Sequence, residues 1–123
     1  MGLDSYAYSM NMLDAAKLVP GEQLPGEIHA PDIAYWRKHH DLHAWMAELA
    51  LRKGYASNWA SFNCVPLPLT LEEIEQLDAH AAQERRTNRD GTFHSYAVQD
   101  QEFLDKARAD ISNGRVIVYD SWW

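Results

Sequence analysis

The strongest concentration of chemically useful side chains in this sequence is one continuous segment, Tyr35-Trp36-Arg37-Lys38-His39-His40. The planar guanidinium of Arg37 suits a phosphate or carboxylate, and Lys38 adds a point charge beside it. Tyr35 and Trp36 supply flat rings for stacking. We therefore predict that this segment, together with His43, binds a ligand or a partner, and a nucleotide would use both kinds of contact. In the alternative interpretation, Trp36 belongs to the core while Arg37 and Lys38 are solvated.

The histidines of this region could also suggest a metal site. His39 and His43 have the i, i+4 spacing at which two imidazoles share a helix face and can hold one ion. The glutamate and the third ligand of a zinc hydrolase motif are missing, so we predict no metal ligand. We expect instead that His43 is oriented by hydrogen bonds in the core, with His39 and His40 at the surface.

Signatures of a catalytic nucleophile are absent from the sequence. There is no G-x-S-x-G, P-loop, G-x-G-x-x-G or H-E-x-x-H motif. The single cysteine, Cys64, has no neighbour in sequence that would activate its thiol, and it also excludes an internal disulfide. We expect no catalytic residue and no cofactor, and we disfavour an enzyme without excluding one.

The charge of the chain constrains its partners. A formal net charge of −7 argues against direct binding of duplex nucleic acid, because phosphate contacts require Lys and Arg. The stretch from Val65 to Glu84 has no Lys or Arg and holds five acids: Glu72, Glu73, Glu75, Asp78 and Glu84. This stretch is either a solvated helix face or a docking surface for a basic protein.

The pair Trp122-Trp123 offers a second candidate interface. Chain ends seldom carry two large aromatic side chains unless these are packed. Packing against Tyr6 and Tyr8 is the structural interpretation. An exposed pair would instead form an interface hot spot and would also favour self-association.

The elements that must position these residues follow from periodicity. A length of 123 residues suits one domain, residues 1–123. Bulky and small residues alternate in 3–12, as in a strand, and the apolar run 115–120 predicts a central strand beside it. Residues 64–69 predict an edge strand because of their two prolines, and residues 93–98 a further short strand.

Three helices are predicted between these strands. Leu42, Trp45, Met46 and Leu49 form the stripe of the first, which begins at Asp32 or at Asp41; in the second case residues 35–40 are a shaped turn. A capping box at Thr70 begins the second helix, and Asp100 is the predicted cap of the third. The expected fold is α+β, with about three helices packed on a small, mainly antiparallel sheet.

The sequence resembles a family of small proteins of bacteriophages and prophages. The shared motifs are Met1-Gly2-Leu3-Asp4, Tyr35-Trp36-Arg37-Lys38, Leu42-His43-Ala44-Trp45 and Tyr119-Asp120-Ser121-Trp122. Their order and approximate spacing agree over nearly the whole chain. His40 stands where the family pattern has Asn, and only Gly91-Thr92-Phe93 represents its Phe-Phe-Gly loop. The resemblance implies an accessory protein acting in the bacterial cytoplasm and assigns no activity.

Two functions are therefore expected, in order of preference. The first is a phage or prophage product that binds and modulates a host protein or protein complex, for example as an inhibitor of a CRISPR or other immune complex. The second is a nucleotide or small-molecule binding protein that sequesters a signal through residues 35–43. No signal peptide and no apolar stretch of membrane-spanning length is found in the sequence, so we expect a cytoplasmic protein without membrane contacts.

Overall fold

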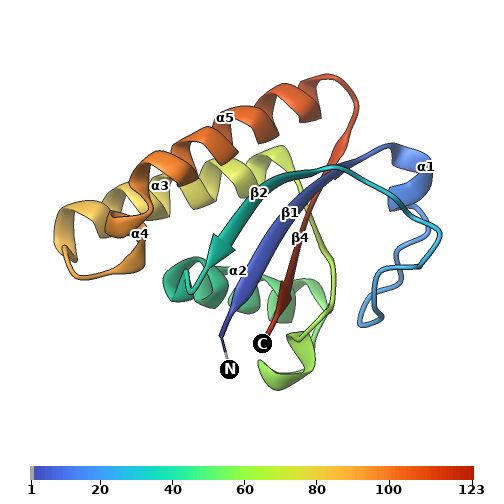
Figure 1. The fold of residues 1–123 in the computed structure, drawn as a ribbon, viewed down its shortest axis with the longest axis horizontal. Helices are drawn as coiled ribbons and strands as arrows, with labels where there is room; N and C mark the ends of the chain where they lie inside the picture. Colours follow the sequence, from blue (N-terminus) through green and yellow to red (C-terminus); the bar gives the residue numbers. More distant parts are fainter. Residues whose placement is uncertain (1) are drawn as a thin grey trace.

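One segment with alternating bulky and small side chains and one continuous apolar run form the two strands at the centre of the sheet. The computed structural model describes residues 2–123, and its four strands are β1 (Asp4–Met10), β2 (Asp32–Arg37), β3 (Leu67–Leu69) and β4 (Val116–Trp122). Their order is β2-β1-β4-β3, and every neighbouring pair is antiparallel. The prediction that the first and last strands are neighbours is confirmed, as is the edge position of β3 (Figure 1).

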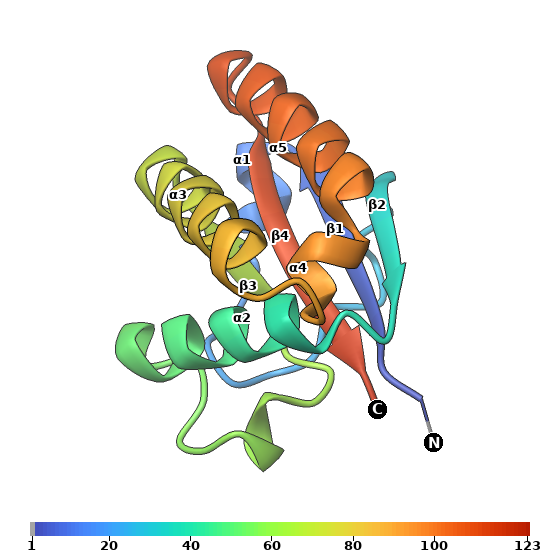
Figure 2. The same ribbon diagram turned by 90° about the vertical axis from the view of Figure 1, so that its left-hand side faces the viewer.

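Helices cover one face of this sheet. The long ones are α2 (His40–Lys53), α3 (Leu71–Thr87) and α5 (Ala97–Ser112), and α4 (Thr92–Ser95) joins α3 to α5 (Figure 2). Between α2 and β3 lies a short 3-10 helix, η1 (Ala60–Phe62). The main core forms between the helices and the sheet, around Trp36, Phe103 and Tyr119. The predicted α+β class, with three substantial helices on an antiparallel sheet, is confirmed.

The opposite face of the sheet is covered over part of its length. Helix α1 (Met12–Ala15) and the loop that follows it lie against Met10 and Val118, and Ile28 completes this smaller core. The end of the sheet near the chain termini carries no such cover (Figure 1). The alternation within each strand therefore places one set of side chains in the main core and the other set on a partly open face.

Local sequence signals explain where the helices begin and end. The side chain of Thr70 accepts from the N–H of Glu73, and the Glu73 carboxylate accepts from the N–H of Thr70, which confirms the predicted capping box. Gly54 caps the C-terminus of α2, and its φ of 78° lies in the left-handed region that glycine enters without strain. No described helix is long and apolar enough to cross a membrane.

The predicted start of the first long helix is wrong. Residues Asp32–Arg37 form strand β2, which pairs with β1 so that Ser5 lies opposite Trp36 and Tyr6 opposite Tyr35. The N-cap of α2 is His39, rather than Asp32 or Asp41. Pairing with β1 determines this structure, and a single-segment pattern of apolar residues does not contain that information.

Two further predictions near the third helix are also wrong. Residues 93–98 belong to α4 and to the first turn of α5, so no strand forms there. Asp100 does not cap α5, because it lies within the first turn and its side chain is buried in the core. Its carboxylate contacts side chains that are distant in sequence. The sequence alone shows only an Asp near the start of a helix, which is also what a cap looks like.

Candidate functional site

The strand geometry of β2 sends the predicted site residues in different directions. Tyr35 and Arg37 lie on the partly open face of the sheet, and Trp36 points into the core with no exposed surface. His39 is also fully buried, which contradicts its predicted surface position. His40 is exposed and lines a pocket beyond the strand. Of the two interpretations of Trp36, the structural one is therefore confirmed.

Trp36 and His39 meet at one buried carboxylate. The indole Nε1 of Trp36 donates to Oδ1 of Asp100 at 2.9 Å, and Nε2 of His39 lies 2.9 Å from Oδ2. The His39 ring also stacks on Tyr96, with centroids 4.7 Å apart. This arrangement joins β2 and the start of α2 to α5 in the interior of the molecule.

A reciprocal contact extends this network to α4. The N–H of Asp41 donates to Oγ1 of Thr92 at 2.9 Å, while the N–H of Thr92 donates to Oδ2 of Asp41 at 2.8 Å. Oγ1 of Thr92 lies 2.8 Å from Nδ1 of His39, which also accepts from the N–H of Leu42. With the ring proton of His39 on Nε2, this nitrogen donates to Asp100 and Nδ1 accepts, so each of these atoms has a matching partner.

The order Thr92–His39–Asp100 has the roles of a hydrolase relay, but its environment argues for a structural function. A nucleophile must reach a substrate, and the base here has no exposed surface. The Thr92 hydroxyl also already accepts the N–H of Asp41. We conclude that the network fixes the starts of α2 and α4 relative to each other.

The open face of the sheet, which we call the aromatic face, gathers three tyrosines and a tryptophan: Tyr6, Tyr8, Tyr35 and Trp122. Tyr6 stacks on Tyr8 with centroids 6.2 Å apart and lies 5.1 Å from the ring of Tyr35. Trp122 is 57% exposed and Tyr35 is 41% exposed. The alternation of the first strand was visible in the sequence, whereas its juxtaposition with Tyr35 required the unexpected strand β2.

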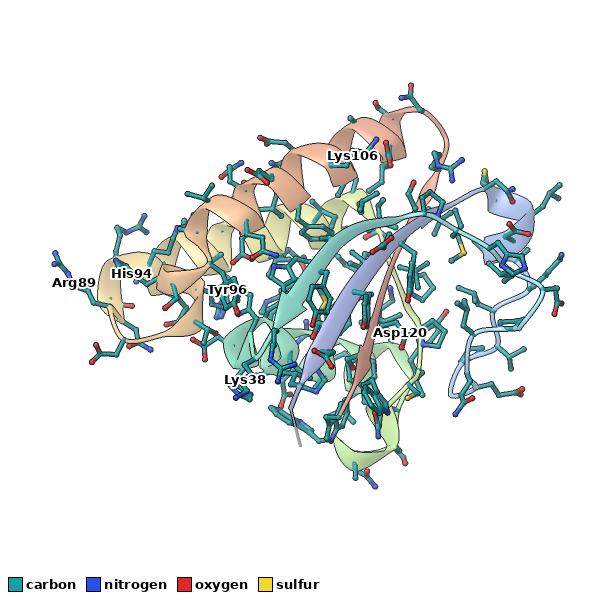
Figure 3. All side chains as sticks on the ribbon, viewed as in Figure 1. Lys38, Arg89, His94, Tyr96, Lys106 and Asp120 are labelled. Atoms are coloured by element: carbon teal, nitrogen blue, oxygen red, sulfur yellow. The ribbon has the colours of Figure 1, made fainter. Side chains whose placement is uncertain are left out.

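Charged groups border these rings. The hydroxyl of Tyr35 donates to Oδ1 of Asp4 at 2.7 Å, and the same oxygen lies 3.6 Å from Nη1 of Arg37. The hydrogen bond to Asp4 raises the pKa of Tyr35. Asp120 lies on β4 (Figure 3). Burial raises the pKa of Asp120 to about 6, although its Oδ1 accepts from the N–H of Ser121. The aromatic face therefore combines stacking surface with carboxylates.

The two terminal tryptophans face opposite sides of the sheet. Trp123 packs edge-on against His43 on the helix side, with ring centroids 4.6 Å apart. The tyrosines Tyr6 and Tyr8 are on the other face, so the predicted packing of Trp123 against them is wrong. Trp122 remains largely exposed, which agrees with the interpretation of a contact surface.

A pocket of about 440 Å³ lies at this end of the sheet and is called the terminal pocket below. Its lining residues are Gly2, Leu3, His40, His43, Trp59, Ala60 and Trp123. Two predicted residues, His40 and His43, therefore share one site with Trp123. Trp59 also lines this pocket and is 44% exposed, and no motif in the sequence singles it out.

His43 is the buried polar group of the terminal pocket. Its Nδ1 lies 2.9 Å from the hydroxyl of Tyr119, which in turn lies 2.8 Å from Oγ of Ser5. Burial lowers the pKa of His43 to about 4, and burial raises the pKa of Tyr119 above its ordinary value. The imidazole is therefore neutral at pH 7, and its predicted orientation by hydrogen bonding in the core is confirmed.

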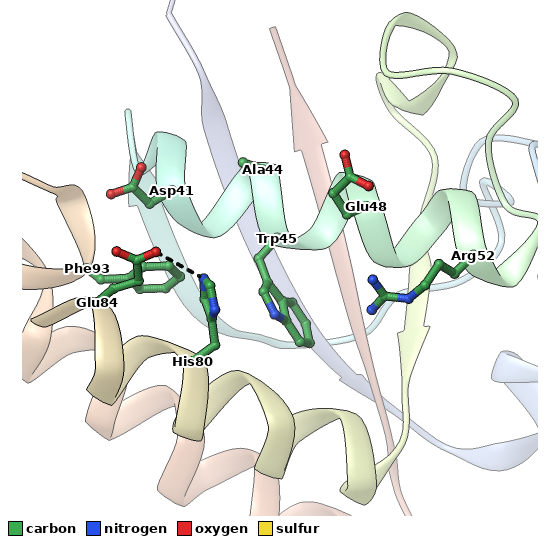
Figure 4. A pocket seen from close by; sticks show the side chains of 8 residues that line it. All are labelled: Asp41, Ala44, Trp45, Glu48, Arg52, His80, Glu84 and Phe93. Carbon is green, nitrogen blue, oxygen red and sulfur yellow. Dashed lines mark ion pairs between the residues drawn. The ribbon is translucent and has the colours of Figure 1, made fainter. Parts of the chain in front are cut away.

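A second concave site lies between α2 and α3. Figure 4 shows Trp45 projecting from α2 towards α3, between His80 and Arg52. The groove between the two helices has a volume of about 420 Å³, and three carboxylates border it: Asp41, Glu48 and Glu84. Each already has a partner, since Asp41 binds Thr92, Glu48 accepts from Trp59, and Glu84 lies 3.7 Å from His80. This groove therefore offers fewer unsatisfied groups than its composition suggests.

The acidic stretch of α3 is largely paired within the chain. Lys53 lies 2.8 Å from Glu73, and Nε of Arg108 donates to Glu75 at 2.7 Å. Arg108 also pairs with Asp78. Glu72 is exposed in the first turn. The sequence-distant cations Lys53 and Arg108 thus neutralise much of the surface whose charge suggested a basic partner.

The candidate metal pair is occupied by other contacts. His39 binds Thr92 and Asp100, and His43 binds Tyr119. Within residues 2–123, no group of three or more His, Cys, Asp or Glu side chains is placed to hold a metal ion. These contacts give each imidazole a role without an ion.

The resemblance to phage proteins rests on the motifs in the sequence, and the sites above rest on geometry. The sequence and the structure of the chain were each compared with known proteins. No protein-family model, no curated protein and no solved structure matches this chain.

Proposed function

We propose that this chain is a phage or prophage accessory protein that binds a host protein or protein complex in the bacterial cytoplasm and modulates it, for example by blocking an immune complex. One observation carries the proposal: Trp122 and Tyr35 are exposed together on the aromatic face, where no other part of residues 2–123 covers them. Large aromatic side chains at the centre of a contact supply much of its binding energy.

The charge of the aromatic face selects the kind of partner. Asp120 and Asp4 lie among the rings, and the whole chain carries a formal charge of −7. Arginine and lysine side chains of a partner can stack on Tyr35 or Trp122 and pair with these carboxylates. The partner is therefore a protein with a basic surface, of the kind that holds nucleic acid.

Capture from a bacterial lysate tests this proposal. The immobilising tag belongs in the exposed loop at residues 21–23, because both described ends of the chain lie beside the aromatic face (Figure 1). We expect a basic protein to be retained stoichiometrically from lysates that include strains with active phage defence. Raised salt should weaken its retention, because charge pairs contribute to binding.

Matched variants decide whether the aromatic face is responsible. The double variant Trp122→Ala and Tyr35→Ala should lose the partner. Val98→Ala removes a more exposed apolar side chain on α5, which lies on the helix side of the sheet, and should retain the partner. Capture of no stoichiometric partner, or equal capture by the double variant, would overturn the proposal.

A further inference from the structure

The terminal pocket is lined by a buried imidazole, His43, whose hydrogen bonding is incomplete. His43 is 8% exposed, and its Nδ1 is engaged by Tyr119, but Nε2 makes no hydrogen bond within residues 2–123. This nitrogen is not sealed from solvent, and His43 lines the pocket. A neutral imidazole nitrogen in such a place either donates or accepts one hydrogen bond. A ligand that fills the pocket must therefore supply a polar atom.

The walls of the terminal pocket are flat and held in place. Nε1 of Trp59 donates to Oε1 of Glu48 at 3.2 Å, which restrains the indole although it is partly exposed. Asn63 contacts the backbone of Trp123 on both sides: Nδ2 donates to its carbonyl at 2.9 Å, and Oδ1 accepts from its N–H at 3.1 Å. Two restrained indoles suit a planar ring, because stacking requires little further ordering.

Two cations lie next to Gly2, which is one of the lining residues, although neither cation lines the pocket itself. A Cβ atom at this position would lie 3.5 Å from Nη2 of Arg37 and 3.9 Å from Cε of Lys38. The N–H of Lys38 donates to the carbonyl of Leu3 at 2.7 Å, which anchors this segment beside the pocket. Arg37 already lies 3.6 Å from Asp4, and Lys38 adds a second cation beside it, so an anionic group that extends from the pocket past Gly2 would be accepted here.

We propose that the terminal pocket binds a nucleotide, whose base stacks on Trp59 and Trp123 and hydrogen-bonds to Nε2 of His43, and whose phosphate lies against Arg37 and Lys38. The volume of about 440 Å³ falls within the range of small-molecule sites. A purely apolar ligand would leave Nε2 unsatisfied and would not use the cations. The stacking part of this site is separate from the aromatic face, since Trp122 and Trp123 point to opposite sides of the sheet, whereas Arg37 lies at the border of both.

Isothermal titration calorimetry on the full chain tests the proposal, with AMP, GMP, CMP and UMP and with the four matching nucleosides as probes. We expect at least one monophosphate to bind with one-to-one stoichiometry. Trp59→Ala should weaken that monophosphate about tenfold or more, because a base–aromatic stack is lost. Trp59 is exposed, so its replacement should leave the fold intact, and circular dichroism verifies this.

Two further variants separate the parts of the site. Arg37→Ala and Lys38→Gly should weaken the monophosphate while leaving the affinity of the matching nucleoside within about twofold. Trp122→Ala is the control, and it should bind the nucleotide like the unmodified chain. The nucleotide site is refuted if none of the monophosphates binds, or if Trp59→Ala binds as tightly as the unmodified chain. Partner capture by Trp59→Ala then reports independently on the proposed function.

Discussion

His39 and Asp100 lie 2.9 Å apart in the interior, joining two segments that are far apart in the sequence. Asp100 also accepts from Trp36, so one carboxylate satisfies two ring N–H groups in a region where water has no access. Buried donors without partners are costly, and this carboxylate therefore sets the position of β2 against α5.

Replacing Asp100 should destabilise the fold. Asp100→Ala leaves Trp36 and His39 with unpaired donors, and we expect a loss of about 2–4 kcal/mol in the free energy of unfolding. Asp100→Asn should lose less, because its carbonyl oxygen can still accept from one ring. Urea denaturation followed by circular dichroism measures both, and Glu102→Ala on the exposed side of α5 is the control. A cost below about 0.5 kcal/mol for Asp100→Ala would contradict the assigned role.

Two buried groups should give the stability opposing dependences on pH. The folded-state pKa of His43 is lowered to about 4 from 6.5, so the unfolded chain binds more protons between these values and stability falls as the pH falls through them. The pKa of Asp120 is raised to about 6 from 3.8, so this group adds stability below about pH 4 that is lost as the pH rises through 6. Between pH 4 and 6 the two contributions partly cancel.

The variant Asp120→Asn separates these contributions. Its amide oxygen can still accept from the N–H of Ser121, and it removes the titration. At pH 8 it should be more stable than the unmodified chain by about 1–3 kcal/mol, the range for a pKa shift of this kind. From pH 6.5 to 4 its free energy of unfolding should fall more steeply. Equal acid slopes in both proteins would show that Asp120 is not appreciably perturbed.

Lys38 combines a charge with an unfavourable backbone conformation. Its φ of 61° lies in the left-handed region, which costs a side-chain-bearing residue about 1 kcal/mol. Lys38→Gly should therefore be about 1 kcal/mol more stable than Lys38→Ala, although both lack the ammonium group. Thermal unfolding compares the two. If the alanine variant is equally stable, this backbone conformation is not maintained in solution.

Arg108 should stabilise the packing of α5 on α3 through its acidic partners. Arg108→Ala should cost about 1 kcal/mol at low ionic strength, because partly exposed ion pairs contribute modestly. The difference should shrink in 1 M salt, where charges are screened. Arg89→Ala removes an exposed arginine in the turn after α3 and should have little effect. A cost that is independent of salt would point to packing of the arginine stem instead.

The parts of the fold that the sequence predicts are those governed by local signals. The capping box at Thr70 determines the start of α3, and the alternation from Asp4 to Met10 determines β1. The continuous apolar run before Asp120 correctly indicated a central strand, because β4 has pairing partners on both sides. These signals act within a few residues, so no knowledge of the rest of the chain is needed to read them.

The parts that could not be predicted depend on contacts across the fold. The alternation of Tyr35, Trp36 and Arg37 is too short to distinguish a strand from the first turn of the helix that follows. Asp100 resembles a helix cap in the sequence, because its buried contacts with Trp36 and His39 form only in the folded chain. For the same reason, the candidate site was predicted as one segment but divides between two faces of the sheet.

The pairing of β1 with β4 has a consequence for the kinetics of folding. Asp4 lies opposite Trp122, so the central hydrogen-bond ladder of the sheet joins the most sequence-distant strands that the fold possesses. Forming this ladder closes a very large loop, and the entropy cost of that closure precedes the favourable contacts between the strands. Topologies with high contact order therefore fold slowly. On a ribosome, β1 stays without this partner until β4 has emerged. During that interval the aromatic residues of β1 are accessible to chaperones.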